Sequence, residues 1–239
     1  MYNEFRIRYH EVEMDAQKYC VPKYAENRPA ALHVLNKKIY EENTHRLMKY
    51  ILEYTQKSAV HAGTFFGDMI PNFSKFCGGT LYAFEPVLEN YVMAKQCIDK
   101  NDIRNAVIFN SALSNKQGTA RFKTISDEGY HMGGWSHIVQ GDMDPNRSQV
   151  VTTLRIDDIQ MEELSVIHLD LEGHEKEALY GAINTITRDE PILILEAGEK
   201  DMSALDGLGY KQMFKGHLID VYSTDKNRYL TEAALKTLP

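Results

Sequence analysis

The sequence predicts an α/β protein with a doubly wound, mostly parallel β-sheet that ends in an antiparallel β-hairpin. Apolar segments of strand length alternate with amphipathic segments of helical spacing five times along the chain, which is the pattern of such a sheet. The last two strand segments, 210–214 and 217–222, flank Lys215-Gly216 and predict the closing hairpin. Open sheets of this kind bind ligands at the carboxyl ends of their strands.

The stretch from Ser58 to Pro86 carries the clearest signal for a cofactor. A short apolar strand at 59–62 runs into a turn that contains Gly63 and Gly67, and an amphipathic helix follows. The glycines let the backbone approach a ligand, and the start of the helix offers unpaired N–H groups. A strand, a glycine turn and a helix in this order hold nucleoside cofactors.

The next strand, 81–84, delivers Glu85 at its carboxyl end, and Gly63 to Glu85 spans 22 residues. A carboxylate about 20 residues after the glycine turn accepts hydrogen bonds from both ribose hydroxyls, although an acid here also favours the start of the following helix. Phe65 and Phe66 suit the crowded pyrophosphate of a dinucleotide badly. S-adenosylmethionine carries no phosphate, so the turn favours a methyltransferase over a dehydrogenase.

Composition indicates a globular protein and excludes several other classes. The chain has 239 residues, of which 43% are hydrophobic and 26% charged, which suits one domain with additions. The net charge of −7 argues against general nucleic-acid binding, and no apolar run approaches the ~20 residues of a membrane span. The charged N-terminus and three scattered cysteines lead us to expect a cytoplasmic protein with reduced thiols.

We expect residues 1–41 to form an N-terminal extension and residues 42–239 to form the cofactor-binding domain. In the extension, residues 5–9 alternate as a strand does, and the segment around Pro22 and Pro29 is expected to be irregular. Residues 42–56 carry the apolar stripe of a helix. This helix either flanks the cofactor or serves packing alone.

The middle of the chain predicts a helix that begins at Pro86, followed by strands at 106–109, 120–124 and 150–156. Ser111 and Ala112 come directly after the third parallel strand, where this fold binds the adenine edge, so both are candidate cofactor contacts. The segment 125–148 is expected to be a long loop. Loops of this length are usually functional or disordered.

That loop carries the candidate acceptor residues His131, Trp135 and His137. A tryptophan flanked by glycines and histidine suits stacking on a sugar ring, and one of the histidines has the chemistry of a general base. The alternative is a surface loop that its aromatic residue fastens to the protein.

The second half predicts a strand at 166–170, a helix to about 187, a strand at 191–196 and a short helix at 203–208. Asp170, Glu172 and His174 lie where the first of these strands becomes a helix, and we predict that they are catalytic. A carboxylate or imidazole there would accept the proton of an attacking hydroxyl. Acids that stabilise the helix start, or a divalent cation on Asp170 and Glu172, are the alternatives; our prediction includes no metal.

These motifs resemble the FkbM family of S-adenosylmethionine-dependent methyltransferases. The resemblance covers residues 42–197 and is carried by HAGTFFG at 61–67, YAFEP at 82–86, NSALS at 110–114 and HLDLEGHE at 168–175. It implies a Rossmann-like class I methyltransferase fold. The family usually has Asp in place of His61, Asn in place of Phe65 and Lys in place of His168. These departures concern the contact with the methionine end of the cofactor, for which Asp68 is an alternative partner.

The predicted cofactor is therefore S-adenosylmethionine. The residues predicted to bind it are His61, Gly63, Phe65, Gly67, Glu85, Ser111, Ala112 and Asp170. The resemblance implies O-methylation of a hydroxyl on a sugar, a glycan or a small secondary metabolite. Two alternatives remain at this point: an NAD(P)-dependent or nucleotide-sugar oxidoreductase on a similar sheet, and a catalytically silent binding protein with the same scaffold.

Overall fold

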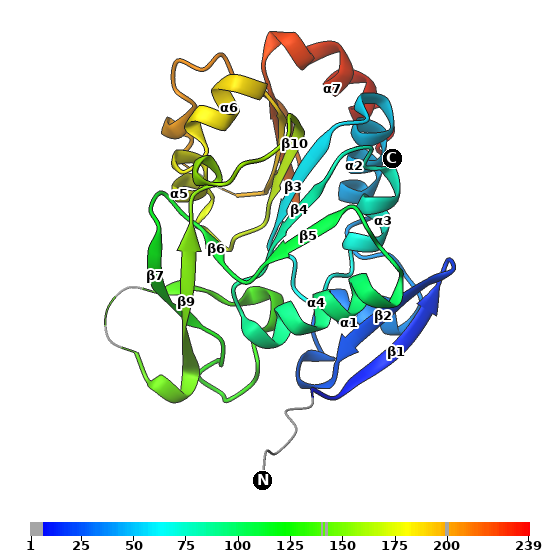
Figure 1. The fold of residues 1–239 in the computed structure, drawn as a ribbon, viewed down its shortest axis with the longest axis vertical. Helices are drawn as coiled ribbons and strands as arrows, with labels where there is room; N and C mark the ends of the chain where they lie inside the picture. The colour runs from blue at the N-terminus through cyan, green and yellow to red at the C-terminus, as the bar shows by residue number, and fades with distance from the viewer. Residues whose placement is uncertain (1–6, 140, 142, 199–200) are drawn as a thin grey trace.

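A seven-stranded sheet with helices on both faces forms the centre of the computed structural model, which describes residues 7–139, 141, 143–198 and 201–239 (Figure 1). The strand order is β12-β13-β11-β10-β3-β4-β5. The strands are β3 (Ser58–Ala62), β4 (Leu81–Phe84), β5 (Ala106–Phe109), β10 (Leu164–Leu169), β11 (Ile192–Glu196), β12 (Lys211–Lys215) and β13 (Ile219–Ser223). Neighbouring strands from β5 to β11 pair in parallel, and β13 is antiparallel to both β11 and β12. The predicted doubly wound sheet with a terminal hairpin is confirmed.

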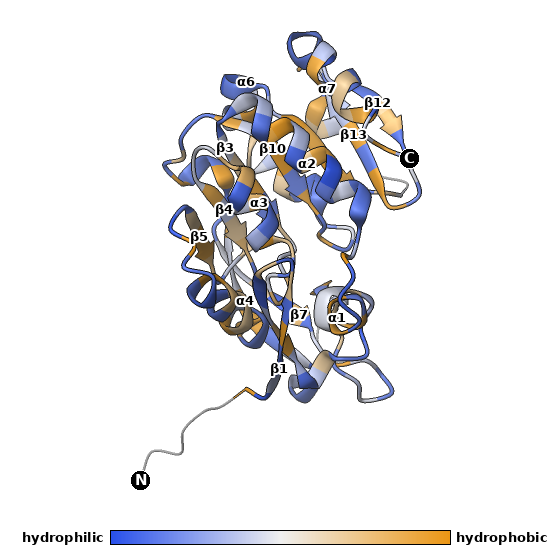
Figure 2. Cartoon of the chain, turned by 90° about the vertical axis from the view of Figure 1, so that its right-hand side faces the viewer, coloured by the Kyte–Doolittle hydropathy of each residue, from blue (hydrophilic) through white to orange (hydrophobic). Residues whose placement is uncertain are grey.

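Two apolar layers hold the helices on the sheet. One face is covered by α2 (Glu42–Thr55), α3 (Ile70–Phe76), α4 (Leu88–Lys100) and α7 (Arg228–Leu235), and the other by α5 (Glu175–Tyr180) and α6 (Ile183–Asp189). Strand β3 supplies both layers, because Ala59 packs with the first set of helices and Val60 with the second. A strand that is buried on both sides reads as a continuous apolar run, and Figure 2 shows hydrophobic residues concentrated in the central strands.

A smaller, four-stranded sheet lies between β5 and β10 in the chain order. Its strands are β6 (Ala112–Leu113), β9 (Ser148–Leu154), β7 (Gly118–Lys123) and β8 (His137–Val139), in that spatial order. The prediction of an uninterrupted loop over 125–148 was therefore wrong. Residues 137–139 pair with β7, and a 3₁₀ turn at Gly133–Trp135 precedes them. Three paired residues are too few for the alternation of a strand to stand out in the sequence.

The N-terminal residues form structure that the sequence did not indicate. Strands β1 (Tyr9–Met14) and β2 (Gln17–Pro22) make a hairpin, and α1 (Pro29–Leu35) follows. The segment around Pro22 and Pro29 is regular, because proline is tolerated at the end of an edge strand and at the first position of a helix. Of the predicted strand at 5–9, residues 5 and 6 lie outside the described residues, and β1 begins at Tyr9.

Two further expectations for the second half were only partly correct. The helix predicted to reach residue 187 is interrupted after Tyr180, where a Cβ on Gly181 would lie 2.0 Å from the carbonyl oxygen of Ser114. Close backbone contact therefore fixes a glycine at the break. The helix predicted at 203–208 is a 3₁₀ turn at Ser203–Leu205. Within the described ranges, no helix has the length and apolar character needed to cross a membrane.

Candidate active site

The glycine turn after β3 is fixed by contact with the neighbouring strand. Gly63 has a φ of +86°, and a Cβ there would lie 1.9 Å from the carbonyl oxygen of Asp170, so no other residue fits without movement of the backbone. Phe65 also has a positive φ, +49°. Its N–H donates a hydrogen bond of 2.8 Å to Oε2 of Glu85. The turn after β3 and the acid after β4 are therefore tied together.

Glu85 is buried at the carboxyl end of β4, with 4% of its surface exposed. Its Oε1 accepts hydrogen bonds from the N–H of Val87 at 2.9 Å and from the side chain of Asn90 at 3.3 Å. Burial raises the pKa of Glu85 to about 8, and these hydrogen bonds only partly oppose that rise. A ligand whose hydroxyl groups donate hydrogen bonds to this carboxyl would favour the ionised form of Glu85.

A small cavity of about 30 Å³ lies beside this carboxyl. Gly63 and Glu85 line it from the ends of β3 and β4, and Ser111 and Ala112 line it from beyond β5. Asp170 lines it from the end of β10, so the structure brings five of the predicted cofactor residues together from four strand ends. The lining side chains are mostly small or apolar, which suits a flat nucleoside more than a charged group.

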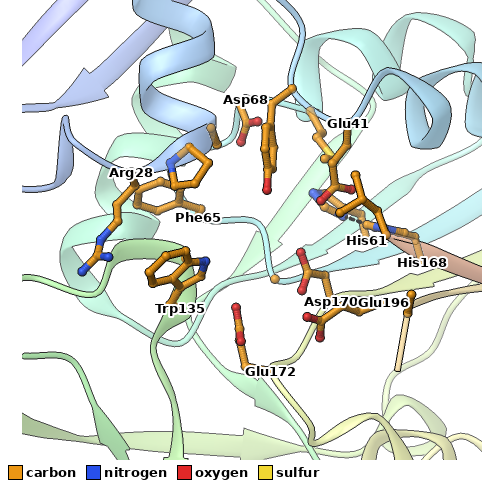
Figure 3. Close-up of a pocket in the computed structure, with 18 of the residues that line it drawn as sticks. Arg28, Glu41, His61, Phe65, Asp68, Trp135, His168, Asp170, Glu172 and Glu196 are labelled. Carbon is orange, nitrogen blue, oxygen red and sulfur yellow. Dashed lines mark hydrogen bonds between the residues drawn. The ribbon is translucent and has the colours of Figure 1, made fainter. Parts of the chain in front are cut away.

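A larger cavity of about 250 Å³ adjoins the first (Figure 3). The two cavities share Gly63, Gly134 and Asp170 at their common edge. His61, Phe65 and Trp135 line only the larger one. Of the predicted cofactor residues, Gly67 lines neither cavity; a Cβ on it would lie 2.9 Å from the Cα of Ala94. Its role in the fold is therefore close packing against α4.

Carboxyl groups from two adjacent strand ends meet in the larger cavity. One carboxylate oxygen from each of Asp170, Glu172 and Glu196 lies within 4.8 Å of the others, and Figure 3 shows these three side chains on the same side of the cavity. Burial, and then the negative charges of Glu196, Glu41 and other neighbours, hold the pKa of Asp170 well above its usual range. Carboxylate oxygens at this spacing can coordinate a hard divalent cation or accept hydrogen bonds from an ammonium group.

Backbone geometry after β10 aims Glu172 at this cavity. Glu172 and the following Gly173 both have positive φ values, +53° and +91°, so the chain turns sharply before α5. Glu175 faces inward and accepts a hydrogen bond of 2.9 Å from the N–H of Leu171. Glu175 therefore closes the turn, and Glu172 is left to line the cavity.

His174 lies apart from the other two predicted catalytic residues. It lines the smaller cavity rather than the larger one, and its Nε2 is 3.1 Å from Oγ of Ser114. Its Nδ1 is 3.5 Å from a carboxylate oxygen of Glu177. Burial lowers the pKa of His174, so the ring is neutral at pH 7. The structure brings Asp170 and Glu172 together and leaves His174 at the smaller cavity.

Two of the departures from the family pattern form one contact. His61 on β3 and His168 on β10 are register partners, and their Nδ1 atoms are 2.9 Å apart. Both side chains are 1% exposed, and Nε2 of His61 has no hydrogen-bond partner. Burial, together with the neighbouring His168, holds the pKa of His61 well below its usual range. A buried histidine pair thus occupies the positions at which the family pattern has Asp and Lys.

Of the three predicted acceptor residues, only Trp135 lines the larger cavity. Trp135 is 51% exposed, and its ring lies across the cavity from the carboxyl groups (Figure 3). His131 and His137 line neither cavity. The carbonyl oxygen of His131 accepts hydrogen bonds from Arg28, and Nδ1 of His137 lies 3.1 Å from the carbonyl oxygen of Trp135.

Several cavity residues escaped the sequence analysis. Arg28 and Glu41 come from the N-terminal part of the chain, and Glu196 and His217 come from its last third. Glu196 carried a usable signal, because it ends a predicted parallel strand at the edge where ligands bind. Arg28, Glu41 and His217 carried none, since a single charged residue outside a motif predicts no site.

The strand order, the glycine turn and the buried acid at the end of β4 define a class I methyltransferase, whose cofactor is S-adenosylmethionine. The chain belongs to the FkbM family of methyltransferases: the family model for the methyltransferase FkbM domain matches residues 61–208. No curated protein sequence matches the chain.

Solved structures similar to this chain include several methyltransferases. The FkbM methyltransferase of Methylobacillus flagellatus is 16% identical with a TM-score of 0.48; the match covers 73% of this chain and 47% of that protein. An S-adenosylmethionine-dependent methyltransferase from Aquifex aeolicus is 14% identical with a TM-score of 0.46, covering 84% of this chain and 96% of the other. The chain therefore spans about half the length of the Methylobacillus protein.

Proposed function

We propose that this protein transfers the methyl group of S-adenosylmethionine to a hydroxyl group of a small molecule or glycan. The observation that carries the proposal is the pair of adjoining cavities, which meet at Gly63, Gly134 and Asp170. The adenosine would lie at the smaller cavity, with its ribose on Glu85 and its adenine near Ser111 and Ala112, and side chains there would have to move to widen its volume of about 30 Å³. The sulfonium would then lie at the common edge and direct its methyl group into the larger cavity.

The larger cavity suits an acceptor that bears hydroxyl groups. Trp135 offers a flat face for a sugar ring, and the carboxyl groups opposite accept hydrogen bonds from hydroxyls. Glu172 is the candidate general base, because it lines this cavity and His174 does not. In the reaction the acceptor oxygen bonds to the methyl carbon, the carbon–sulfur bond breaks, and the hydroxyl proton passes to Glu172. S-adenosylhomocysteine leaves as the neutral product.

The FkbM family match disfavours the oxidoreductase alternative. It does not distinguish an active enzyme from a catalytically silent protein, which would keep the same fold without transferring a methyl group. We place the reaction in the cytoplasm, which is supported by three cysteines that are free and buried. The −7 net charge supports an acceptor other than nucleic acid.

The test is methyl transfer from labelled S-adenosylmethionine to a panel of sugars, glycans and polar metabolites, with the product identified as a methyl ether. Glu172→Gln should lower turnover by roughly 10²–10⁴ and leave the affinity for S-adenosylhomocysteine almost unchanged. Glu232→Gln is the matched control, because Glu232 lies on α7 and pairs with Arg228. Methyl ethers formed at equal rates by wild type and Glu172→Gln would remove Glu172 as the base.

The same assay tests the cation alternative. If a chelator abolishes transfer and Mg²⁺ or Mn²⁺ restores it, a divalent cation on Asp170, Glu172 and Glu196 activates the hydroxyl in place of a general base. A labelled product on nitrogen or carbon would contradict the hydroxyl acceptor. No labelled product from any acceptor, with cofactor binding intact, would favour the catalytically silent protein.

A further inference from the structure

The N-terminal segment 7–35 lies outside the family match at 61–208 and contacts both halves of the site. Two of its side chains make these contacts. Tyr24 comes from the 3₁₀ turn after β2, and Arg28 directly precedes α1. Tyr24 reaches Asn90 on α4 and also packs its ring on His131, and Arg28 reaches His131 and Trp135 in the same segment.

Tyr24 is connected to the buried acid through one amide. Its hydroxyl donates a hydrogen bond of 2.7 Å to Oδ1 of Asn90, and Asn90 is 1% exposed. The amide nitrogen of Asn90 then lies 3.3 Å from Oε1 of Glu85 and 3.5 Å from the carbonyl oxygen of Gly133. Because the hydroxyl of Tyr24 occupies the amide oxygen, the NH₂ group of Asn90 must face Glu85.

Arg28 holds the segment around Trp135 at two points. Its Nε donates a hydrogen bond of 2.9 Å to the carbonyl oxygen of His131, and its Nη2 donates to the same oxygen. Its guanidinium carbon lies 4.7 Å from the centre of the Trp135 ring, within the range of a cation–π contact. Figure 3 shows the guanidinium beside Trp135 and directed away from the carboxyl groups. Arg28 therefore supports the ring from the edge of the larger cavity, which it also lines.

We propose that the N-terminal segment positions both reactants: Tyr24, acting through Asn90, orients Glu85 for the cofactor ribose, and Arg28 orients Trp135 as a wall of the acceptor site. This inference rests on the proposed function, which assigns Glu85 to the ribose and Trp135 to the acceptor. Tyr24 lines neither cavity, and Arg28 lies at the edge of the larger one with its guanidinium on Trp135. Each is a positioning residue that acts through another side chain.

The first experiment separates positioning of Glu85 from general support of the fold. Calorimetry compares the binding of S-adenosylhomocysteine and of its 2′,3′-dideoxy analogue, which lacks both ribose hydroxyls. Tyr24→Phe should weaken the binding of S-adenosylhomocysteine about 3- to 10-fold, because one orienting hydrogen bond is lost. It should leave the binding of the dideoxy analogue unchanged. Tyr229→Phe, a change at a tyrosine that is 79% exposed, is the matched control.

Three outcomes of this experiment decide the first half of the proposal. Equal losses for both ligands in Tyr24→Phe would overturn it, because a general weakening of the fold does not depend on the ribose hydroxyls. Wild-type affinity in that variant would also overturn it. Failure of the wild-type protein to bind S-adenosylhomocysteine would instead refute the proposed function, and the inference with it.

The second experiment uses the fluorescence of Trp135, the one tryptophan in the sequence. Arg28→Met removes the cation and both hydrogen bonds while keeping a side chain that packs. It should change the emission of Trp135 and raise its quenching by acrylamide about twofold, since the ring loses its support. The affinity for S-adenosylhomocysteine should stay within about twofold of wild type. Arg46→Met, at an exposed arginine on α2, is the control.

Arg28→Lys sharpens this result. It keeps the charge and loses the two-point contact with His131, so its emission should lie between wild type and Arg28→Met. Emission and quenching that are unchanged in Arg28→Met would overturn the assignment of Arg28. A loss of cofactor affinity equal to that of Tyr24→Phe would also overturn it, because the two residues would then act on the same half of the site.

Discussion

The two adjoining cavities are built in different ways. The smaller one is lined by residues at the carboxyl ends of β3, β4, β5 and β10 and by residues of β7, β8 and the segment before β8, and small or apolar side chains predominate there. The larger one draws on the N-terminal segment, the strand ends of β10 and β11, and the hairpin near His217, and it gathers carboxyl groups. The first is a feature of the sheet itself, whereas the second is assembled from parts of the chain that are far apart in sequence.

Under the proposed function, this difference separates the binding of a nucleoside from the selection of an acceptor. A parallel sheet places its strand ends together whatever the rest of the chain does, so the nucleoside half follows from the fold. The acceptor half depends on where added segments pack, and Arg28 and His217 lie outside the family match at 61–208. We therefore expect changes in the smaller cavity to affect cofactor binding and folding, and changes in the larger cavity to affect turnover.

The largest expected effect is at the common edge of the cavities. Gly63→Ala should destabilise the protein by more than about 4 kcal/mol, because the new Cβ would lie 1.9 Å from the carbonyl oxygen of Asp170. Gly129→Ala is the matched control: its φ of +84° is close to the +86° of Gly63, but no atom lies within 4 Å of its Cβ. Urea unfolding should show a loss of only about 1 kcal/mol there.

Equal losses of unfolding free energy at the two positions would mean that backbone strain alone explains why residue 63 must be glycine. The contact between β3 and β10 would then contribute nothing, and the common edge would not be fixed by close packing.

The next effect concerns the histidine pair beside the larger cavity. His61→Asp and His168→Lys should each cost roughly 2–4 kcal/mol, since each buries a charge against a neutral partner. The double variant creates the Asp and Lys of the family pattern and should recover about 1–3 kcal/mol of the summed loss. Urea unfolding of the four proteins measures this coupling. Additive losses would indicate that the two departures are unrelated changes.

A smaller effect is expected from pH. The pKa of Glu85 is raised to about 8 by burial, so the folded state holds its proton more tightly than the unfolded state. The stability from this group is full below about pH 4.5 and is lost as the pH rises to about 8. Burial also raises the pKa of Asp68, to about 7, with the same sign. Burial lowers the pKa of His45 to about 4, which costs stability below about pH 6.5.

The useful window is therefore pH 6.5 to 8.5, which spans the raised pKa of Glu85 and lies above the lowered pKa of His45. Between these values the cofactor-free protein should lose stability, and Glu85→Gln should lose about 2 kcal/mol less, because its amide does not ionise. Chemical denaturation at both pH values measures the difference. An identical pH dependence in the two proteins would contradict the raised pKa of Glu85.

The same contrast between the cavities explains how much could be predicted. The sheet and its closing hairpin followed from apolar periodicity, and Gly63 and Glu85 followed from their spacing, because these signals lie within one continuous stretch. The contact between His61 and His168 depends on the register of β3 and β10, and that register could not be predicted from the sequence. Arg28 and Tyr24 act through contacts with residues more than 60 positions away, and no local pattern encodes such contacts.

The break in the helix at Gly181 illustrates the same limit. The apolar spacing of residues 178–186 is helical throughout, and the interruption comes from contact with the backbone at Ser114. A tertiary contact overrides a local preference there. The local apolar spacing predicted the type of each strand or helix, whereas tertiary packing determined the residue at which the element ends.

The central claim is that the cofactor joins the two cavities, with its ribose on Glu85. Calorimetry with S-adenosylhomocysteine and NAD, on wild type and Glu85→Ala, tests it most directly. We expect micromolar binding of S-adenosylhomocysteine to the wild type, and a loss of one to two orders of magnitude in the variant, or about 1.5–3 kcal/mol for hydrogen bonds to a charged group. NAD should not bind. Unchanged affinity in Glu85→Ala, or binding of NAD in place of S-adenosylhomocysteine, would contradict the account.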